Sequence, residues 1–195
     1  MAIRIKAAAV TGEKQIDIKE LETGDLRGSE ALVKVRAVAL CTLEQRAFRG
    51  EMKMPLPFLG GHEVAGDIVA LGPGANRKIW KEGQRVAVRM LYSCGECYNC
   101  RTGHTNMCTQ AQRKPVREGM IPGPGGLCDQ IVVSTKDLFL IPDGISYEEA
   151  SLTDIWGTLQ VEEIVRAKAL RQNCAWYPEA NPEMVCQEQR EQKEE

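Results

Sequence analysis

Four cysteines lie close together in one short stretch of the chain, CGECYNCRTGHTNMC at residues 94–108. They follow the spacing Cys-x2-Cys-x2-Cys-x7-Cys and comprise Cys94, Cys97, Cys100 and Cys108. Thiolates on adjacent tight turns can converge on one tetrahedral ion, and four of them leave no coordination position open. We therefore predict a structural zinc site that braces a loop and does not itself react with a substrate.

Disulfide bonds are the main alternative use of these cysteines. The start of the chain shows no signal peptide, and we expect an intracellular protein, which keeps its thiols reduced. The other cysteines show no spacing that suggests pairs or a further four-thiolate site; they are Cys41, Cys128, Cys174 and Cys186. These observations favour zinc over disulfides.

A zinc ribbon that binds nucleic acid is a second alternative. Arg113, Lys114 and Arg117 lie just beyond the cysteine run and would support it. The net charge is −2, however, so the chain has no broad basic surface to neutralise phosphates, and no aromatic residues alternate with the basic ones. We expect no nucleic-acid partner.

A reactive metal site needs three protein ligands and one open position, and the chain offers candidates for it. Cys41 and His62 supply a thiolate and an imidazole, which are both good zinc ligands. Asp154 can supply a carboxylate as the third ligand, and Glu63, beside His62, can act as a transient ligand or orient the others. Spacing alone supports this site weakly. A lone histidine is usually an ordinary polar residue, and a lone cysteine usually packs in the hydrophobic core.

The secondary-structure elements that position these residues are predicted to be mainly strands. Short apolar runs separated by glycine and proline occur at 3–10, 15–21, 31–40, 62–71, 84–91 and 129–134. A short helix fits 42–50. This order predicts a mainly β fold, an antiparallel sheet or barrel, and not an alternating βαβ fold. Cys41 directly follows one predicted strand and His62 begins another, so both candidate ligands lie at strand ends.

The pattern changes after Pro142. Ser146 and Glu149 form a Ser-x-x-Glu capping box that predicts a helix start, and apolar spacing extends the helical pattern beyond it. We predict a C-terminal helical segment at 158–177. Residues 178–195 are rich in Glu and Gln, and we predict that this polar tail is disordered.

Length and composition limit the class of protein. The chain has 195 residues, of which 43% are hydrophobic, enough for one good core and an appendage. Its longest apolar runs are strand-length, too short to span a bilayer. We expect a soluble cytoplasmic protein with no membrane partner.

Three motifs together resemble the zinc-dependent medium-chain alcohol dehydrogenases. Residues 61–75, GHEVAGDIVALGPGA, are similar to the zinc signature Gly-His-Glu-x2-Gly-x5-Gly of that family. The cysteine run at 94–108 resembles its structural zinc loop, and the interval from Cys41 to His62 is also similar. The resemblance covers about residues 3–160. It implies a GroES-like β-barrel catalytic domain over 3–157 that carries two zinc ions per chain.

The resemblance also implies roles for individual residues. Cys41, His62 and Asp154 would hold the reactive zinc, with Glu63 and Thr42 completing the catalytic set. Zinc would act as a Lewis acid on a small alcohol or carbonyl substrate during hydride transfer with NAD or NADP.

Two departures from the family pattern affect these roles. Members commonly carry Ser or Thr two residues after the ligand cysteine, where this chain has Leu43, with Thr42 one position earlier. The proton relay is therefore not assigned. Glu44 stands where Asp is common, and it could pair with a nearby arginine such as Arg46. We expect His104, inside the cysteine run, to be a surface residue because four thiolates already fill that shell.

The cofactor half of the family fold is not evident. Gly72-Pro-Gly74 and Gly123-Pro-Gly125-Gly126 do not match a dinucleotide fingerprint, because neither combines the required third glycine with a following helix. We therefore expect the Rossmann domain to be absent and NAD(P) to bind only in full-length relatives, which would leave this chain inactive as a dehydrogenase.

Two further expectations follow from that absence. Apolar surface near Ile155, Trp156 and Leu159 would be uncovered and could support a homo-oligomer or another association. A noncatalytic zinc-binding GroES-like interaction module remains the alternative function.

Overall fold

The computed structural model of the chain describes residues 2–90, 92–111 and 115–153. The predicted helical segment at 158–177, the polar tail and Asp154 lie outside these residues. The elements of the first third are β1 (Ile3–Gly12), β2 (Gln15–Thr23), β3 (Glu30–Ala39) and α1 (Thr42–Phe48). Next come β4 (Glu63–Leu71), β5 (Arg85–Arg89), α2 (Tyr98–Arg101) and the 3-10 helix η1 (Thr105–Met107). The last are β6 (Gln130–Ser134), the 3-10 helix η3 (Thr135–Asp137), β7 (Leu138–Leu140) and α3 (Tyr147–Ser151).

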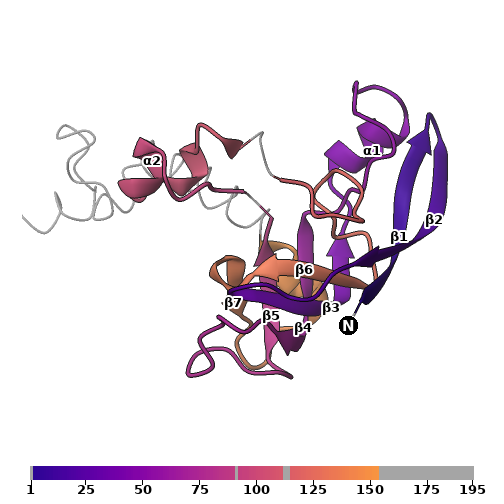
Figure 1. Ribbon diagram of the computed structural model, residues 1–195. Helices are drawn as coiled ribbons and strands as arrows, with labels where there is room; N and C mark the ends of the chain where they lie inside the picture. The colour runs from indigo at the N-terminus through magenta and orange to yellow at the C-terminus, as the bar shows by residue number, and fades with distance from the viewer. Residues whose placement is uncertain (1, 91, 112–114, 154–195) are drawn as a thin grey trace, which may run out of the picture. The chain divides into compact units, whose positions relative to one another are not determined.

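The strands form two antiparallel sheets (Figure 1). The larger has the order β6-β3-β4-β5-β7, and β1 pairs with β2 in a separate hairpin. The prediction of a mainly β fold is confirmed, and each of the six predicted runs contains a strand. Strand β7 is not among the predicted runs, because its three residues are too few to show an alternating pattern.

The central strand β4 is covered on both faces. Val64 and Ile68 pack with Val33 and Val86 in the main core of the sheet. On the opposite face, Ala65 belongs to a second buried cluster with Ala87, Ile141 and Ala150. Because both faces of β4 are buried, its sequence reads as a continuous apolar run with no clean alternation.

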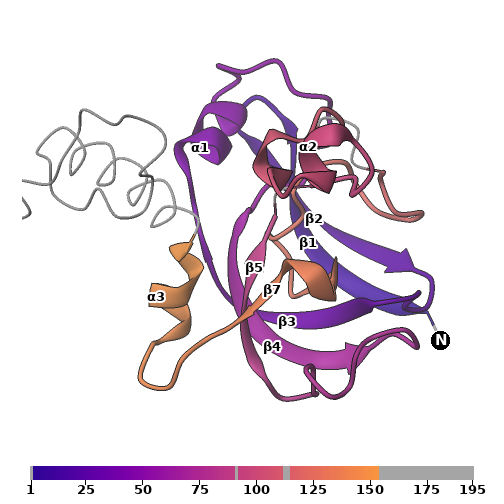
Figure 2. The same cartoon turned by 90° about the vertical axis from the view of Figure 1, so that its left-hand side faces the viewer.

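Helix α3 covers that second face and contacts β3, β4 and β5 (Figure 2). The predicted capping box is present: the Ser146 hydroxyl accepts a hydrogen bond from the Glu149 N–H at 3.1 Å, and the Glu149 carboxylate accepts one from the Ser146 N–H at 2.8 Å. Small side chains such as Ala150 let the helix approach the sheet closely.

A polar cluster fastens α3 at its first turn. Asp67 of β4 accepts hydrogen bonds from the Tyr147 hydroxyl and from Arg36 Nε, the latter at 2.6 Å. The Arg85 guanidinium lies over the Tyr147 ring, 4.5 Å from its centroid. Burial would raise the pKa of Asp67, but the hydrogen bonds from Tyr147 and Arg36 hold this pKa below its ordinary value.

The β1–β2 hairpin joins the rest through two isolated bridges, Ala7 with Cys128 and Val10 with Phe58. Ile5, Ala7 and Leu59 form a buried cluster there. None of the helices within the described ranges is long and apolar enough to cross a membrane.

Candidate metal centres

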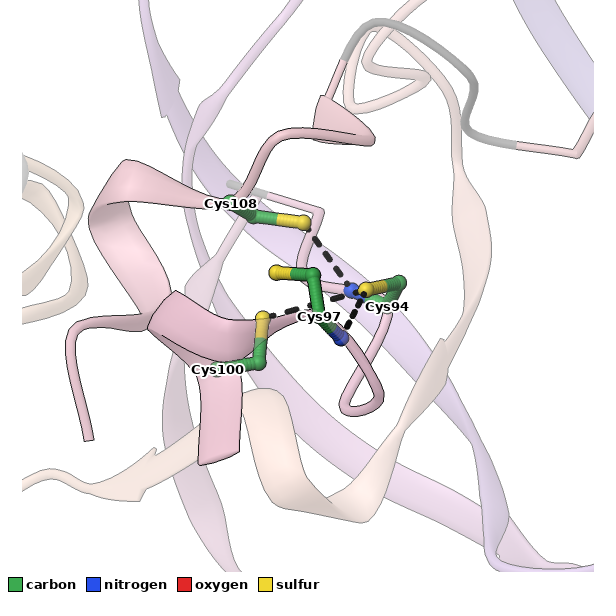
Figure 3. A group of neighbouring side chains, drawn as sticks. All are labelled: Cys94, Cys97, Cys100 and Cys108. Carbon is green, nitrogen blue, oxygen red and sulfur yellow. Dashed lines mark hydrogen bonds between the residues drawn. The ribbon is translucent and has the colours of Figure 1, made fainter. Parts of the chain in front are cut away.

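The four cysteines of the run at 94–108 point toward one another in the structure (Figure 3). Their sulfur atoms all lie within 4.8 Å of one another, and Cys94 Sγ is 3.9 Å from Cys100 Sγ. A tetrahedral zinc with Zn–S bonds of about 2.3 Å needs sulfur atoms about 3.8 Å apart. The donor set and spacing therefore fit a metal ion, and this cysteine cluster could hold one.

Tight turns bring these cysteines together. Gly95 has φ +79°, a conformation that glycine adopts without strain. Cys97 caps the short helix α2, which carries Cys100, and Cys108 directly follows η1. Short turns of this kind leave backbone N–H groups free to point at sulfur, and the Cys97 N–H donates to Cys94 Sγ at 3.3 Å.

Backbone donors also set the protonation of these thiols. The N–H groups of Cys100 and Thr109 lower the pKa of Cys97 to about 6, and the N–H of Cys94 lowers the pKa of Cys108. Burial, with neighbouring thiols, raises the pKa of Cys100 to about 11. Without a cation, the four groups cannot all ionise side by side; a divalent cation removes that conflict.

Charged side chains fasten the loop at residues 94–108, which we call the cysteine lobe, to the sheet. Arg89 of β5 donates to Asp137 of η3 at 2.7 Å and to the Thr105 hydroxyl at 3.3 Å. Lys136 Nζ donates to the Ser93 carbonyl at 3.0 Å. The lobe therefore has a fixed attachment beyond its own turns.

The prediction for His104 is confirmed, since its side chain is exposed and its Nδ1 lies 3.2 Å from the Thr102 hydroxyl. All six described cysteines are free thiols. Cys128 is partly buried and belongs to neither cluster of candidate ligands; desolvation raises its pKa to about 12.

A second group of candidate ligands combines Cys41, His62 and Glu63, whose ligand atoms lie within 4.8 Å of one another. The antiparallel register of β3 and β4 explains the meeting, because Ala39 lies opposite Glu63. Cys41 follows Ala39 by two residues and caps α1, while His62 directly precedes β4. The sheet thus joins two positions that are far apart in sequence.

Glu44 fixes the orientation of His62. One carboxylate oxygen of Glu44, Oε1, lies 2.9 Å from His62 Nδ1 and accepts a hydrogen bond from the Gly61 N–H at 2.9 Å. The His62 Nε2 atom lies 3.9 Å from Glu63 Oε1. Glu44 is buried, and its other oxygen, Oε2, has no hydrogen-bond partner among the described residues.

The predicted pairing of Glu44 with Arg46 is wrong. Arg46 is instead 3.9 Å from Glu51, in an exposed ion pair. Helix α1 turns Glu44 inward toward His62 and leaves Arg46 outside. The contact of Glu44 with His62 was not predicted; the available signal was a carboxylate three residues after Cys41, on the first turn of a predicted helix.

These contacts change the protonation of the ligands. The hydrogen bond with Glu44 raises the pKa of His62 to about 9, and the Leu43 backbone N–H lowers the pKa of Cys41. Burial would raise the pKa of Glu44, but His62 and the Gly61 N–H hold this pKa below its ordinary value. Since a metal binds neutral imidazole, loading this cluster must displace a proton from His62.

A close backbone contact supports this cluster. Gly61 has φ +88°, and a Cβ there would lie 2.5 Å from the Leu127 backbone nitrogen. The Gly126 N–H donates to the Gly61 carbonyl at 2.8 Å. The glycine therefore allows a tight turn beside His62.

Of the remaining predicted site residues, Thr42 lies within the described residues and Asp154 lies outside them. The Thr42 hydroxyl oxygen lies 3.7 Å from Cys41 Sγ. Leu43 occupies the place of the usual hydroxyl residue and is partly buried. Asp154 lies outside the described residues, so its role as third ligand stays a prediction.

Comparisons with known proteins agree with this architecture. A family model, the alcohol dehydrogenase GroES-like domain, matches residues 27–143. The sequence is 34% identical over 154 residues to sorbitol dehydrogenase from Bacillus subtilis (strain 168), covering 77% of this chain and 42% of that protein. The chain therefore spans less than half the length of this relative.

Two solved structures show the same fold. Acetophenone reductase from Geotrichum candidum NBRC 4597, in complex with NAD, is 29% identical with a TM-score of 0.66, covering 77% of this chain and 43% of that one. A cobalt- and zinc-bound thermostable alcohol dehydrogenase from Pyrobaculum aerophilum is 28% identical with a TM-score of 0.61, covering 76% of this chain and 44% of that one.

Proposed function

Because the chain belongs to the alcohol dehydrogenase GroES-like domain family, we propose that it is the zinc-binding catalytic-domain portion of a zinc-dependent alcohol or polyol dehydrogenase. The observation that carries this proposal is the meeting of Cys41, His62 and Glu63 beside a buried carboxylate that orients the imidazole. A module that zinc serves only as a structural brace already has a complete four-cysteine cluster and has no need of this second arrangement.

Each cluster has a separate role in this proposal. Cys94, Cys97, Cys100 and Cys108 hold a structural zinc, and Cys41 and His62 bind a second zinc with Asp154 as the predicted third ligand. Zinc bound at the second cluster supplies a Lewis acid that polarises the oxygen of a small alcohol or carbonyl compound for hydride transfer with NAD or NADP.

The chain's own residues prepare this second site. The Leu43 N–H stabilises the Cys41 thiolate, and Glu44 engages His62 Nδ1 at 2.9 Å while Nε2 lies 3.9 Å from Glu63 Oε1. The Glu63 carboxylate is buried close to His62 Nε2, where it can exchange with a ligand or bias the ring. Thr42 places a hydroxyl beside the thiolate and is the available candidate for the first group of a proton relay.

Zinc content tests the proposal independently of turnover. We expect elemental analysis to find two zinc ions per purified wild-type chain and one in the double variant Cys41→Ala, His62→Ala. The matched control is Cys128→Ala, His104→Ala, which removes one thiol and one imidazole outside both clusters and should retain two zinc ions. Asp154→Ala, measured in the same way, tests the third ligand.

The opposite result points to the noncatalytic module. If the wild-type chain holds a single zinc and the Cys41, His62 variant keeps it, the second site does not bind metal and the proposal fails. Circular dichroism of each variant separates loss of a ligand from loss of the fold.

A further inference from the structure

Strand β2 leaves one edge of its hairpin open. Within the described ranges, β2 pairs with β1 alone, and it forms the outer strand of the hairpin (Figure 1). Ile16 and Ile18 on this strand are 54% and 62% exposed. An open edge offers backbone N–H and C=O groups for pairing with another strand, and exposed isoleucines add apolar surface to it.

The far end of the same edge is already covered. Arg117 donates to the Thr23 hydroxyl at 2.6 Å and to the Gly24 carbonyl at 2.9 Å. The backbone of Gly119 lies so close that a Cβ there would be 1.9 Å from the Glu22 carbonyl oxygen. The chain thus closes the edge at residues 22–24 and leaves residues 15–20 exposed or partly exposed.

The open segment, QIDIKE, is complementary to itself when two copies run antiparallel. With a two-fold axis at Ile18, that residue meets its own copy, and Asp17 of each strand faces Lys19 of the other. Residues directly opposite in an antiparallel pair lie on the same face, so opposite charges attract across the strands. An axis at Asp17 or at Lys19 would instead place identical charges opposite each other, which disfavours both registers.

We propose that the outer edge of β2 binds the same edge of a second copy of this chain, antiparallel and centred on Ile18. The contact is isologous, since one surface patch meets itself across a two-fold axis. It joins the two hairpins into a four-stranded sheet with the order β1-β2-β2-β1. It uses neither cluster of candidate metal ligands and does not depend on the proposed function.

The existing ion pair within β2 does not oppose this contact. Lys19 Nζ lies 3.0 Å from Asp17 Oδ2 of the same strand, and both side chains are about half exposed. An exposed pair of this kind contributes little to stability, so each group can also pair with the opposite charge on the facing strand. One short strand pair buries less than the roughly 1,200 Å² of a standard interface, so the dimer is weak and depends on concentration.

Charge reversal tests the register directly by sedimentation velocity over a wide concentration range. The wild-type chain should show a sedimentation coefficient that rises with concentration. The variants D17K and K19D should each lose that rise, because each places like charges opposite each other in both pairs. An equimolar mixture of D17K and K19D should recover it, because each strand then carries the charge that the other lacks.

The control is E82K, which changes charge by the same amount as D17K in an exposed turn far from β2 in sequence, and it should behave as wild type. Unchanged circular dichroism and zinc content show that each variant is folded. A wild-type chain that stays monomeric throughout would overturn the proposal. So would single variants that associate as wild type does, or a mixture that does not recover association.

Discussion

The two candidate metal centres are built in different ways. The four-cysteine lobe takes all its donors from residues 94–108, where a few tight turns suffice to bring them together. The second centre needs Cys41 and His62, which flank two different strands at the end where those strands lie side by side, and Glu44 from the helix α1 that follows Cys41. The first can form wherever its loop can turn, whereas the second exists only when the sheet has formed.

This difference sets how each centre responds to change. Metal binding at the lobe is coupled to the folding of a single loop, since the thiolates themselves are most of its structure. At the second centre the surrounding fold holds the ligands before metal arrives, because buried Glu44 and the Gly61 contact orient them. Variants can therefore damage one centre without the other.

The largest expected effect is at the lobe. Cys100→Ser removes a ligand, and we expect the lobe to lose zinc affinity by more than about 100-fold, the upper end of what losing an outer partner costs. Zinc per chain should fall by one while the second centre keeps its ion. Competition with a chelator measures both. If both ions leave together, the two centres are not independent, which contradicts the conclusion that one centre can be damaged without the other.

A smaller effect is expected from Gly61→Ala. The substitution places a side chain at positive φ and against the Leu127 backbone, so the free energy of unfolding should fall by about 2–5 kcal/mol. The matched control is Gly83→Ala, where φ is +85° but the space is open, and the cost should be about 1–2 kcal/mol. Chemical denaturation measures both. Equal costs would show that the close approach beside His62 is unimportant.

The smallest expected effect is from Glu44→Gln, which keeps the shape but removes the charge. Zinc affinity at the second centre should fall about 10–100-fold, with the lobe unchanged. In protein loaded with one zinc equivalent, which the four thiolates should bind first, the pKa of His62 should fall from about 9 toward 6.5. Proton NMR can follow this, because the chain has only two histidines.

The sign of the accompanying stability change is fixed by linkage. In the wild-type chain, the raised pKa of His62 stabilises the folded state fully below pH 6.5, and this contribution is lost as pH rises through about 9. The stability difference between wild type and Glu44→Gln should therefore shrink over that window. A constant difference would mean that Glu44 acts through packing alone.

Prediction from sequence succeeded where the signal is local. The six strand runs and the capping box at Ser146 depend on residue types a few positions apart, and the structure contains them. The short strand β7 was missed because its three residues carry no pattern. The predicted partner of Glu44 was wrong because the true partner depends on which side of α1 faces Gly61 and His62, and the residues next to Glu44 do not encode that.

The sequence by itself determined the cysteine lobe, since the spacing of residues 94–108 already limits how their thiolates can meet. It also determined the mainly β character of the fold. Only the tertiary structure decided that Cys41, His62 and Glu63 meet, that Glu44 orients the imidazole, and that β2 leaves one stretch of edge open. The physical reason is sequence separation: strand register and helix packing create these contacts between residues whose own neighbours carry no information about them.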